Sequence, residues 1–156
     1  MAKYIKRKYP DVRKVFAVGS KAIRQALEAE SIEVVGADVD VIPPDQNFGN
    51  KEFEIYELDP EIGAVVYGID YGFNNAKLCI ASLYLNEMKV PLIVSNDDAN
   101  ALIYGHFMPG AGAALQSILT ATDLRKGSHP RSTSIEEPGT FDLLGKPNPF
   151  TIDLIR

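Results

Sequence analysis

Val15-Phe16-Ala17-Val18-Gly19-Ser20 is a continuous apolar run that ends at a glycine and a serine. An unbroken apolar stretch of this length is typical of a strand that is buried on both faces of a parallel sheet. Ser20 is a suitable N-cap for the next segment, in which apolar residues repeat at helical spacing to about Glu30. Residues 32–35 predict a second strand, which ends at Gly36. The stretch therefore predicts a compact β-α-β unit.

A second unit of the same kind follows. Residues 64–67 and 91–94 are again short apolar runs, and a helix is expected between them at about 76–88, with Asn74 or Asn75 as its cap. That helix is apolar on most faces, so we expect it to be covered on more than one side, by the core or by another subunit. Two such units in succession predict an α/β fold.

The segments around these units are less regular. Residues 37–60 contain many acids, the pair Pro43-Pro44 and a Gly-Asn pair, which predict a loop with a short strand near residues 53–55. A third helix is expected to open at Pro109-Gly110-Ala111-Gly112. Residues 123–140 are polar and aperiodic and are expected to form an exposed excursion, and residues 141–144 predict a short strand.

A last helix is expected to begin near Pro149, a residue that suits the first helical turn. Only two turns fit before Arg156, and so short a helix is marginal without packing. We therefore expect a chain that once continued.

Composition excludes several classes of protein. A length of 156 residues suffices for one good core, or for one small domain and part of another. The net charge of -5 argues against a nucleic-acid-binding surface. The single cysteine, Cys79, excludes an intrachain disulfide and is expected to be a buried thiol in a reducing compartment. No run approaches the roughly 20 apolar residues of a membrane span, and the basic N-terminus lacks the apolar core of a secretory signal. A cytoplasmic protein without membrane or nucleic-acid partners is expected.

Two polar segments follow predicted strands, at the edge of an α/β sheet where ligands bind. Residues 68–73 combine polar and aromatic groups, and Asn96-Asp97-Asp98 forms a carboxylate cluster. Each also suits an ordinary turn and helix cap, and the residues alone leave both interpretations open. Gly145-Lys146-Pro147, taken by itself, indicates a turn more than a catalytic lysine.

Other binding motifs are absent or incomplete. Pro109-Gly110-Ala111-Gly112 imitates a dinucleotide fingerprint, but no strand directly precedes it and Leu115 takes the place of the third glycine. There is no Walker A pattern. His106 and His129 lie in unrelated contexts, so they form neither a metal pair nor part of a catalytic triad. A free-standing nucleotide-binding Rossmann domain is therefore disfavoured.

The order of the motifs is more informative than any one of them. In sequence they are Val18-Gly19-Ser20, residues 64–70 with Lys77-Leu78, residues 92–96 with Asp98, Pro109-Gly110-Ala111-Gly112, and Gly145-Lys146-Pro147-Asn148-Pro149-Phe150. Over almost its whole length the chain resembles the phosphoglycolate phosphatase/4-nitrophenylphosphatase family of the haloacid dehalogenase (HAD) superfamily. Five motifs in the right order make the resemblance specific.

The resemblance implies a fold and a domain organisation. Members have a Rossmann-like core into which a large α/β cap domain is inserted. Residues 1–12 then match the end of a core helix, residues 13–100 the cap, and residues 101–156 a partial core segment with the conserved-lysine motif. The nucleophile motif Asp-x-Asp-Gly, the Ser/Thr phosphate motif and the Gly-Asp-x-x-x-x-Asp magnesium motif of the family have no match in this chain. We therefore expect a HAD-like hydrolase fragment that is inactive alone.

The resemblance also implies a chemistry. An aspartate attacks phosphorus, water hydrolyses the aspartyl-phosphate, and Mg²⁺ together with a lysine neutralises the accumulating negative charge. Lys146 matches that lysine. The cap closes over the substrate, a small phosphorylated metabolite, so residues of the loop after residue 67 and of the turn after residue 94 are expected to approach it. These tentative substrate-binding residues are Asp70, Tyr71, Gly72, Asn74 and Asn96. No metal ligand is expected within this chain.

Two departures from the family pattern stand out. Animal members carry a histidine where this chain has Gly72, and the excursion at 123–140 is longer than in many relatives. The alternative interpretation is a non-catalytic α/β binding or homodimerisation module derived from the cap, since caps of this family commonly form homodimers.

Overall fold

The structure is a computed structural model that describes residues 1–37, 56–122, 124 and 141–145. In chain order its helices and strands are α1 (Ala2–Lys8), β1 (Lys14–Val18), α2 (Lys21–Glu28), β2 (Glu33–Gly36), β3 (Ile62–Tyr67), α4 (Asn75–Glu87), β4 (Leu92–Val94), β5 (Asn100–Ile103), β6 (His106–Pro109), α5 (Ala111–Ala121) and β7 (Asp142–Leu143). The predicted short strand near 53–55, the helix after Pro149 and nearly all of the 123–140 excursion lie outside the described residues.

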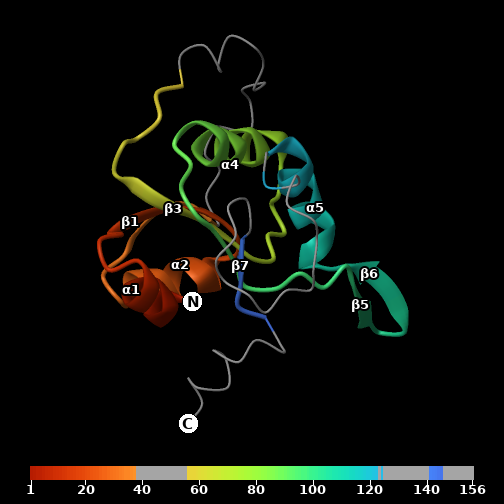
Figure 1. Ribbon diagram of the computed structural model, residues 1–156. Coiled ribbons are helices and arrows are strands. Elements are labelled where there is room, and N and C mark those ends of the chain that lie inside the picture. Colours follow the sequence, from red (N-terminus) through yellow and green to blue (C-terminus); the bar gives the residue numbers. More distant parts are fainter. Residues whose placement is uncertain (38–55, 123, 125–140, 146–156) are drawn as a thin grey trace.

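Five strands form a parallel sheet in the order β2-β1-β3-β4-β7. Its strands carry apolar residues on both faces because helices cover both faces (Figure 1). Val15 and Ala17 of β1 pack with α1 and α2, whereas Phe16 and Val18 point to the opposite face and pack with α4 and α5. The sequence prediction of an α/β fold with a parallel sheet is confirmed.

Helix α4 lies between the sheet and α5, which explains why most of its faces are apolar. Its buried residues include Ile80, Tyr84 and Leu85. Asn74 is the N-cap, and its side-chain Oδ1 accepts a hydrogen bond from the Lys77 amide at 3.0 Å. Ser20 stands at the N-cap position of α2 as predicted, but its side chain makes no capping hydrogen bond.

The predicted boundary at residue 100 stays a prediction. Beyond it, α5 packs on α4, and β7 pairs with β4 through Ile93 opposite Asp142 and Val94 opposite Leu143. Both elements therefore complete the sheet-centred core that residues 14–94 begin. None of the helices in the described ranges combines the length and the apolarity that a membrane crossing needs.

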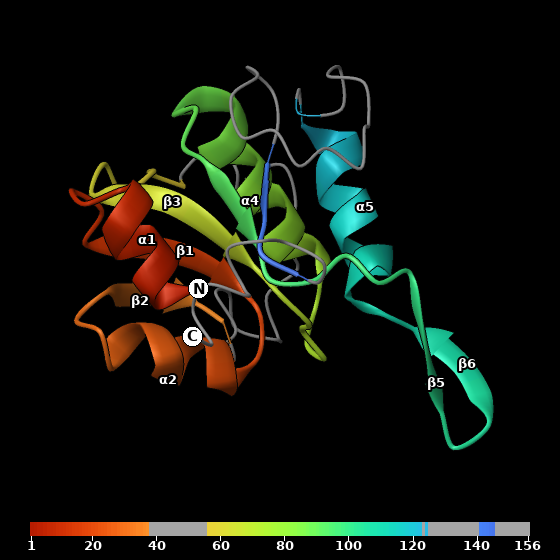
Figure 2. The same cartoon turned by 60° about the horizontal axis from the view of Figure 1, so that its bottom comes forward.

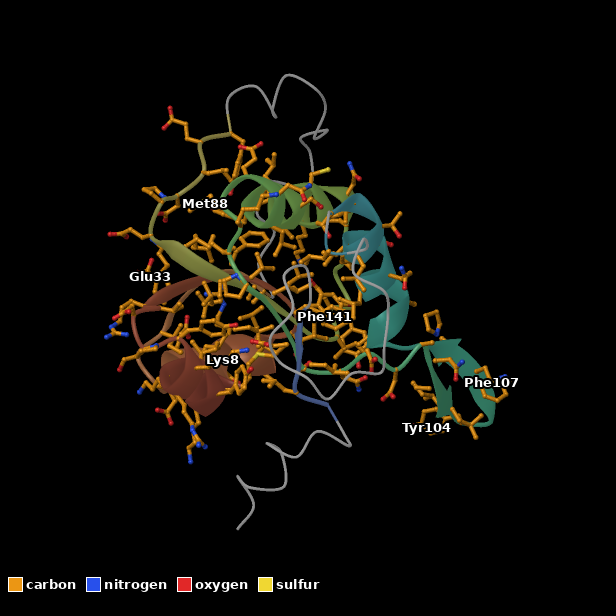
Figure 3. The ribbon with its side chains drawn as sticks, viewed as in Figure 1. Lys8, Glu33, Met88, Tyr104, Phe107 and Phe141 are labelled. Atoms are coloured by element: carbon orange, nitrogen blue, oxygen red, sulfur yellow. The ribbon has the colours of Figure 1, made fainter. Side chains whose placement is uncertain are left out.

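A feature that the sequence analysis did not predict is the antiparallel hairpin of β5 and β6. It projects from the body of the molecule between β4 and α5 (Figure 2). Tyr104 at its tip is 98% exposed and Phe107 is 79% exposed, so the hairpin contributes nothing to the core. Figure 3 shows both side chains on the projecting arm.

Candidate active site

The carboxyl ends of four neighbouring strands meet at one edge of the sheet. The Gly68 amide donates to the Val18 carbonyl at the ends of β3 and β1, and the Ser95 amide donates to the Tyr67 carbonyl at the ends of β4 and β3. The Leu144 amide donates to the Val94 carbonyl, which adds the end of β7. The loops after these strands are therefore neighbours at the edge where α/β proteins bind ligands.

Two glycines allow the backbone to pack closely at this edge. A Cβ on Gly68 would lie 2.3 Å from Ile23 Cδ1 and 2.7 Å from Ser95 Oγ, so a side chain there would require Ile23 and Ser95 to move. A Cβ on Gly145 would lie 3.2 Å from the Ser95 carbonyl oxygen and 3.6 Å from Asn96 Cα. Gly145 therefore lies against the Ser95-Asn96 turn. Lys146 follows it directly in sequence and lies outside the described residues.

The loop between β3 and α4 is held by a buried ion pair. Lys77 Nζ lies 2.8 Å from Asp70 Oδ2 and donates a second hydrogen bond of 2.9 Å to the Ala37 carbonyl. The two side chains are only 2% and 4% exposed. The other carboxylate oxygen of Asp70 accepts a hydrogen bond from the Gly72 amide at 2.8 Å. These contacts tie α4, the end of β2 and the loop into one unit.

The predicted substrate-binding residues fall into two groups: those whose side chains form hydrogen bonds within the protein, and those that are exposed without such a role. Asp70 accepts with one oxygen from the Gly72 amide in the loop and with the other from Lys77 of α4, and Asn74 uses Oδ1 to cap α4. Asn96 Oδ1 accepts from the Asp98 amide at 2.6 Å, so it orders the turn after β4. Tyr71 is 89% exposed, and a Cβ at Gly72 would meet nothing closer than 3.5 Å. Tyr71 and Gly72 are thus exposed positions of the loop, as is Asn74, and the substrate-binding assignments stay predictions.

The Pro109-Gly110-Ala111-Gly112 motif serves backbone packing. A Cβ on Gly112 would lie 2.2 Å from the Asp97 carbonyl oxygen, and one on Gly110 would lie 2.2 Å from that of Asp98. The Gly112 amide donates to the Asp98 carbonyl at 2.8 Å. The start of α5 is therefore docked on the turn after β4. Its glycines are explained by this close approach.

Tyr67 also stabilises the junction between α5 and the carboxyl edge of the sheet. It is fully buried at the end of β3, and its hydroxyl donates a hydrogen bond to the Ala111 carbonyl at the start of α5. Burial raises the pKa of Tyr67 to about 12. The phenol therefore stays protonated, and stays a donor, across the physiological range.

Lys77 is the residue of this edge to which sequence reasoning gave no role. The sequence did contain a pattern that indicates this pair, because a lysine in an otherwise apolar helix needs a buried partner, and Asp70 stands seven residues earlier.

The described part of the chain contains no evident site for magnesium. No group of three or more His, Cys, Asp or Glu converges there. These residues do not fit a metal centre, so no step is derived through one.

The chain has clear relatives among phosphatases, although no family model matches it. It is 27% identical to the 4-nitrophenylphosphatase of Schizosaccharomyces pombe over 148 residues, which cover 94% of this chain and 44% of that protein. It is 29% identical to the glycerol-3-phosphate phosphatase of Rattus norvegicus over 143 residues, 91% of this chain and 39% of that protein. It is 27% identical to phosphoglycolate phosphatase 2 of Arabidopsis thaliana over 99% of this chain and 46% of that protein. The chain thus spans less than half the length of these relatives.

The fold agrees with these matches. The glycerol phosphate phosphatase of Mycobacterium tuberculosis, solved with calcium, superimposes with a TM-score of 0.67 at 19% identity, over 99% of this chain and 35% of that one. Sequence and fold therefore confirm the resemblance, and this chain is similar to a segment, less than half in length, of the HAD-type phosphatases of the 4-nitrophenylphosphatase and phosphoglycolate phosphatase family.

Proposed function

We propose that the chain is the cap and part of the core of a magnesium-dependent phosphomonoesterase that acts on small phosphorylated metabolites through an aspartyl-phosphate. The observation that carries the proposal is the sequence match to phosphatases, which extends over 91–94% of the chain in two of them. The relatives are hydrolases of phosphoric monoesters. 2-Phosphoglycolate, glycerol phosphate and 4-nitrophenyl phosphate define the class of substrate: compact, anionic esters.

The residues of this chain would act by placing charge and excluding water. Lys146 follows Gly145, which lies against the Ser95-Asn96 turn at the carboxyl edge of the sheet. A lysine ammonium near that edge would neutralise the negative charge of the phosphate and of the attacking carboxylate together. Mg²⁺ held by residues outside the described part of the chain would supply further neutralisation of negative charge. The nucleophile and the metal ligands would come from sequence that this chain does not contain.

The loop at residues 70–74 would contact the leaving group. Its shape is set in advance by the buried Asp70–Lys77 pair, so the exposed ring of Tyr71 is presented from a rigid base. Preorganisation of this kind lowers the entropic cost of ordering the loop around a substrate. Because Gly72 offers no imidazole, Tyr71 is the larger recognition group of this loop.

The first experiment measures turnover of 4-nitrophenyl phosphate with magnesium. The 156-residue chain alone is expected to show none, because positioning without a nucleophile gives little rate. In a longer protein that joins this chain to an Asp-x-Asp-Gly motif, Lys146→Ala is expected to lower kcat on the order of 10²–10³-fold. Lys6→Ala, at an exposed lysine of α1, is the matched control and should leave the rate unchanged. A Lys146→Ala enzyme near the wild-type rate would show that the lysine assignment is wrong.

The exposed hairpin favours a second candidate function, a homodimerisation module. Leu102, Tyr104 and Phe107 are 66–98% exposed, and no residue from 100 to 109 is an acid, a lysine or an arginine. Uncharged, apolar strand edges readily pair with a second copy of themselves. A two-stranded hairpin is also only marginally stable alone, so such pairing would stabilise it.

Sedimentation equilibrium tests this candidate. The wild-type chain is expected to dimerise, and Tyr104→Ser with Phe107→Ser is expected to give a monomer. Tyr71→Ser is the matched control, because it removes another highly exposed tyrosine, 89% against 98% for Tyr104, from a different loop. A wild-type chain that stays monomeric, or a double variant that still dimerises, would exclude the hairpin as the interface.

A further inference from the structure

The N-terminal helix and the last strand of the sheet are joined by a side-chain cluster. Lys8 Nζ lies 2.7 Å from Asp142 Oδ1, and the Tyr9 hydroxyl donates to Asp142 Oδ2 at 2.7 Å. The partners are 134 and 133 residues apart in sequence. Both carboxylate oxygens are therefore engaged by α1 and its C-cap. Figure 3 labels Lys8, and β7 can be located in Figure 1.

This cluster is more buried than an ordinary surface ion pair. The Asp142 side chain is 11% exposed and that of Lys8 is 28% exposed. Lys8 Nζ also lies 5.7 Å and 5.3 Å from the ring centroids of Tyr4 and Tyr9, which pack edge to face. Burial and the Asp142 carboxylate raise the pKa of both phenols. The tyrosines consequently stay protonated and keep Asp142 enclosed.

The backbone alone holds β7 weakly. Its ladder with β4 contains only two residue pairs, and the Leu144 amide adds one hydrogen bond to the Val94 carbonyl. Strand β7 is also the last strand of the sheet in the described residues. So short a pairing leaves the strand free to fray unless side chains fix it.

The position of β7 matters because the strand leads directly to Gly145 and the conserved-lysine motif. Gly145 lies against the Ser95 carbonyl two residues after the strand ends, and Lys146 comes next. At the other end of the cluster, Tyr9 directly precedes the turn that leads into β1, where the Val12 amide bonds the Tyr9 carbonyl. The cluster therefore ties the segment that leads into the sheet to the segment that leaves it.

We propose that Lys8, Tyr9 and Asp142 form a latch that fixes the end of β7, the strand that leads to Gly145 at the carboxyl edge of the sheet. They are positioning residues, and their relevance to catalysis rests on the function proposed above. In the predicted division into cap and core, residues 1–12 are the end of a core helix and β7 belongs to the core segment at residues 101–156. The latch therefore joins the two segments that lie on either side of the predicted cap in the sequence.

Hydrogen exchange of single amides in the 156-residue chain tests the latch. Lys8→Met and Asp142→Asn are each expected to speed exchange of the Leu144 amide by roughly tenfold, the size expected for a lost bond to a charged group. The Ser95 amide, bonded to Tyr67 at the same sheet edge, is expected to stay unchanged and is the internal reference. Lys8→Arg, which keeps the charge, is expected to restore wild-type exchange.

Lys6→Met is the matched control, because Lys6 makes a 2.9 Å ion pair from the same helix to Glu30 and not to β7. It should leave the Leu144 amide unaffected. Unchanged Leu144 exchange in Lys8→Met and Asp142→Asn would overturn the proposal, and so would equal acceleration of Leu144 and Ser95, which would signal general loss of stability. Should Asp142→Asn fail to fold, Lys8→Met and Tyr9→Phe carry the same test. None of these outcomes depends on phosphatase activity, which the Lys146→Ala experiment tests separately.

Discussion

Replacing Lys77 by methionine should destabilise this fold far more than replacing any exposed lysine. The side chains of Lys77 and Asp70 are 2% and 4% exposed, and their charged atoms are 2.8 Å apart. Lys77→Met leaves the Asp70 carboxylate buried with one remaining donor, the Gly72 amide, and also removes the hydrogen bond to the Ala37 carbonyl. Removing one partner of a buried pair costs about 3–5 kcal/mol, because an uncompensated charge remains in the interior.

The matched control has the same geometry with different burial. Lys6 and Glu30 form a 2.9 Å ion pair whose side chains are 47% and 34% exposed. Lys6→Met should therefore cost about 0–1 kcal/mol. The double variant Asp70→Asn with Lys77→Met removes both charges and should be more stable than Lys77→Met alone, since neutral groups need less solvation.

The assays are urea unfolding, which gives the free energy of unfolding, and thermal unfolding, which gives Tm. Both are followed by far-ultraviolet circular dichroism, because the chain contains no tryptophan for fluorescence. For a domain of this size, a loss of about 3–5 kcal/mol should lower Tm by about 6–20 °C. If Lys77→Met costs no more than Lys6→Met, burial of the pair does not govern its energy. The rigid base assigned to the loop at residues 70–74 would then be refuted.

Two further outcomes follow from the junction between β4 and α5. Gly112→Ala should destabilise the chain by about 1–3 kcal/mol in the same unfolding assay, because its Cβ would lie 2.2 Å from the Asp97 carbonyl oxygen, whereas Gly72→Ala should stay within about 0.5 kcal/mol. Equal stability of the two variants would contradict the close approach. The raised pKa of Tyr67, about 12 against an ordinary value of 10, means that the folded state holds the phenolic proton more tightly than the unfolded state. Its contribution to stability is therefore complete below pH 10 and lost towards pH 12. Over that interval the free energy of unfolding of wild type should fall more steeply than that of Tyr67→Phe; parallel curves would show that Tyr67 is not the titrating group.

The sheet and its helices could be predicted because the pattern that specifies them is local. The apolar runs at residues 15–18 and 64–67 can be satisfied only by burial on both faces, and Asn74 can satisfy an amide of the first turn of α4 within its own segment. The hairpin of β5 and β6 was missed because its apolar residues point to solvent. Without a buried face there is no alternation between core and surface for the sequence to display.

The candidate site was predictable in outline only. The turns after residues 67 and 94 could be placed at one edge of the sheet, because the carboxyl ends of parallel strands share an edge. The hydrogen-bond partners of the side chains in those turns could not be predicted. That Asp70 would be buried against Lys77, and Asn96 used to order its own turn, depends on how α4 packs over the end of β2.

The parallel α/β core and the likeness to phosphatases could be read from the chain, because apolar runs, caps and motifs are written in consecutive residues. The strand order that places the end of β7 beside the Ser95-Asn96 turn could not, and neither could the contacts of Lys8 and Tyr9 with Asp142. The difference lies in sequence separation. Contacts between residues about 130 positions apart leave no local pattern, and they exist only after the core has brought the two ends of the chain together.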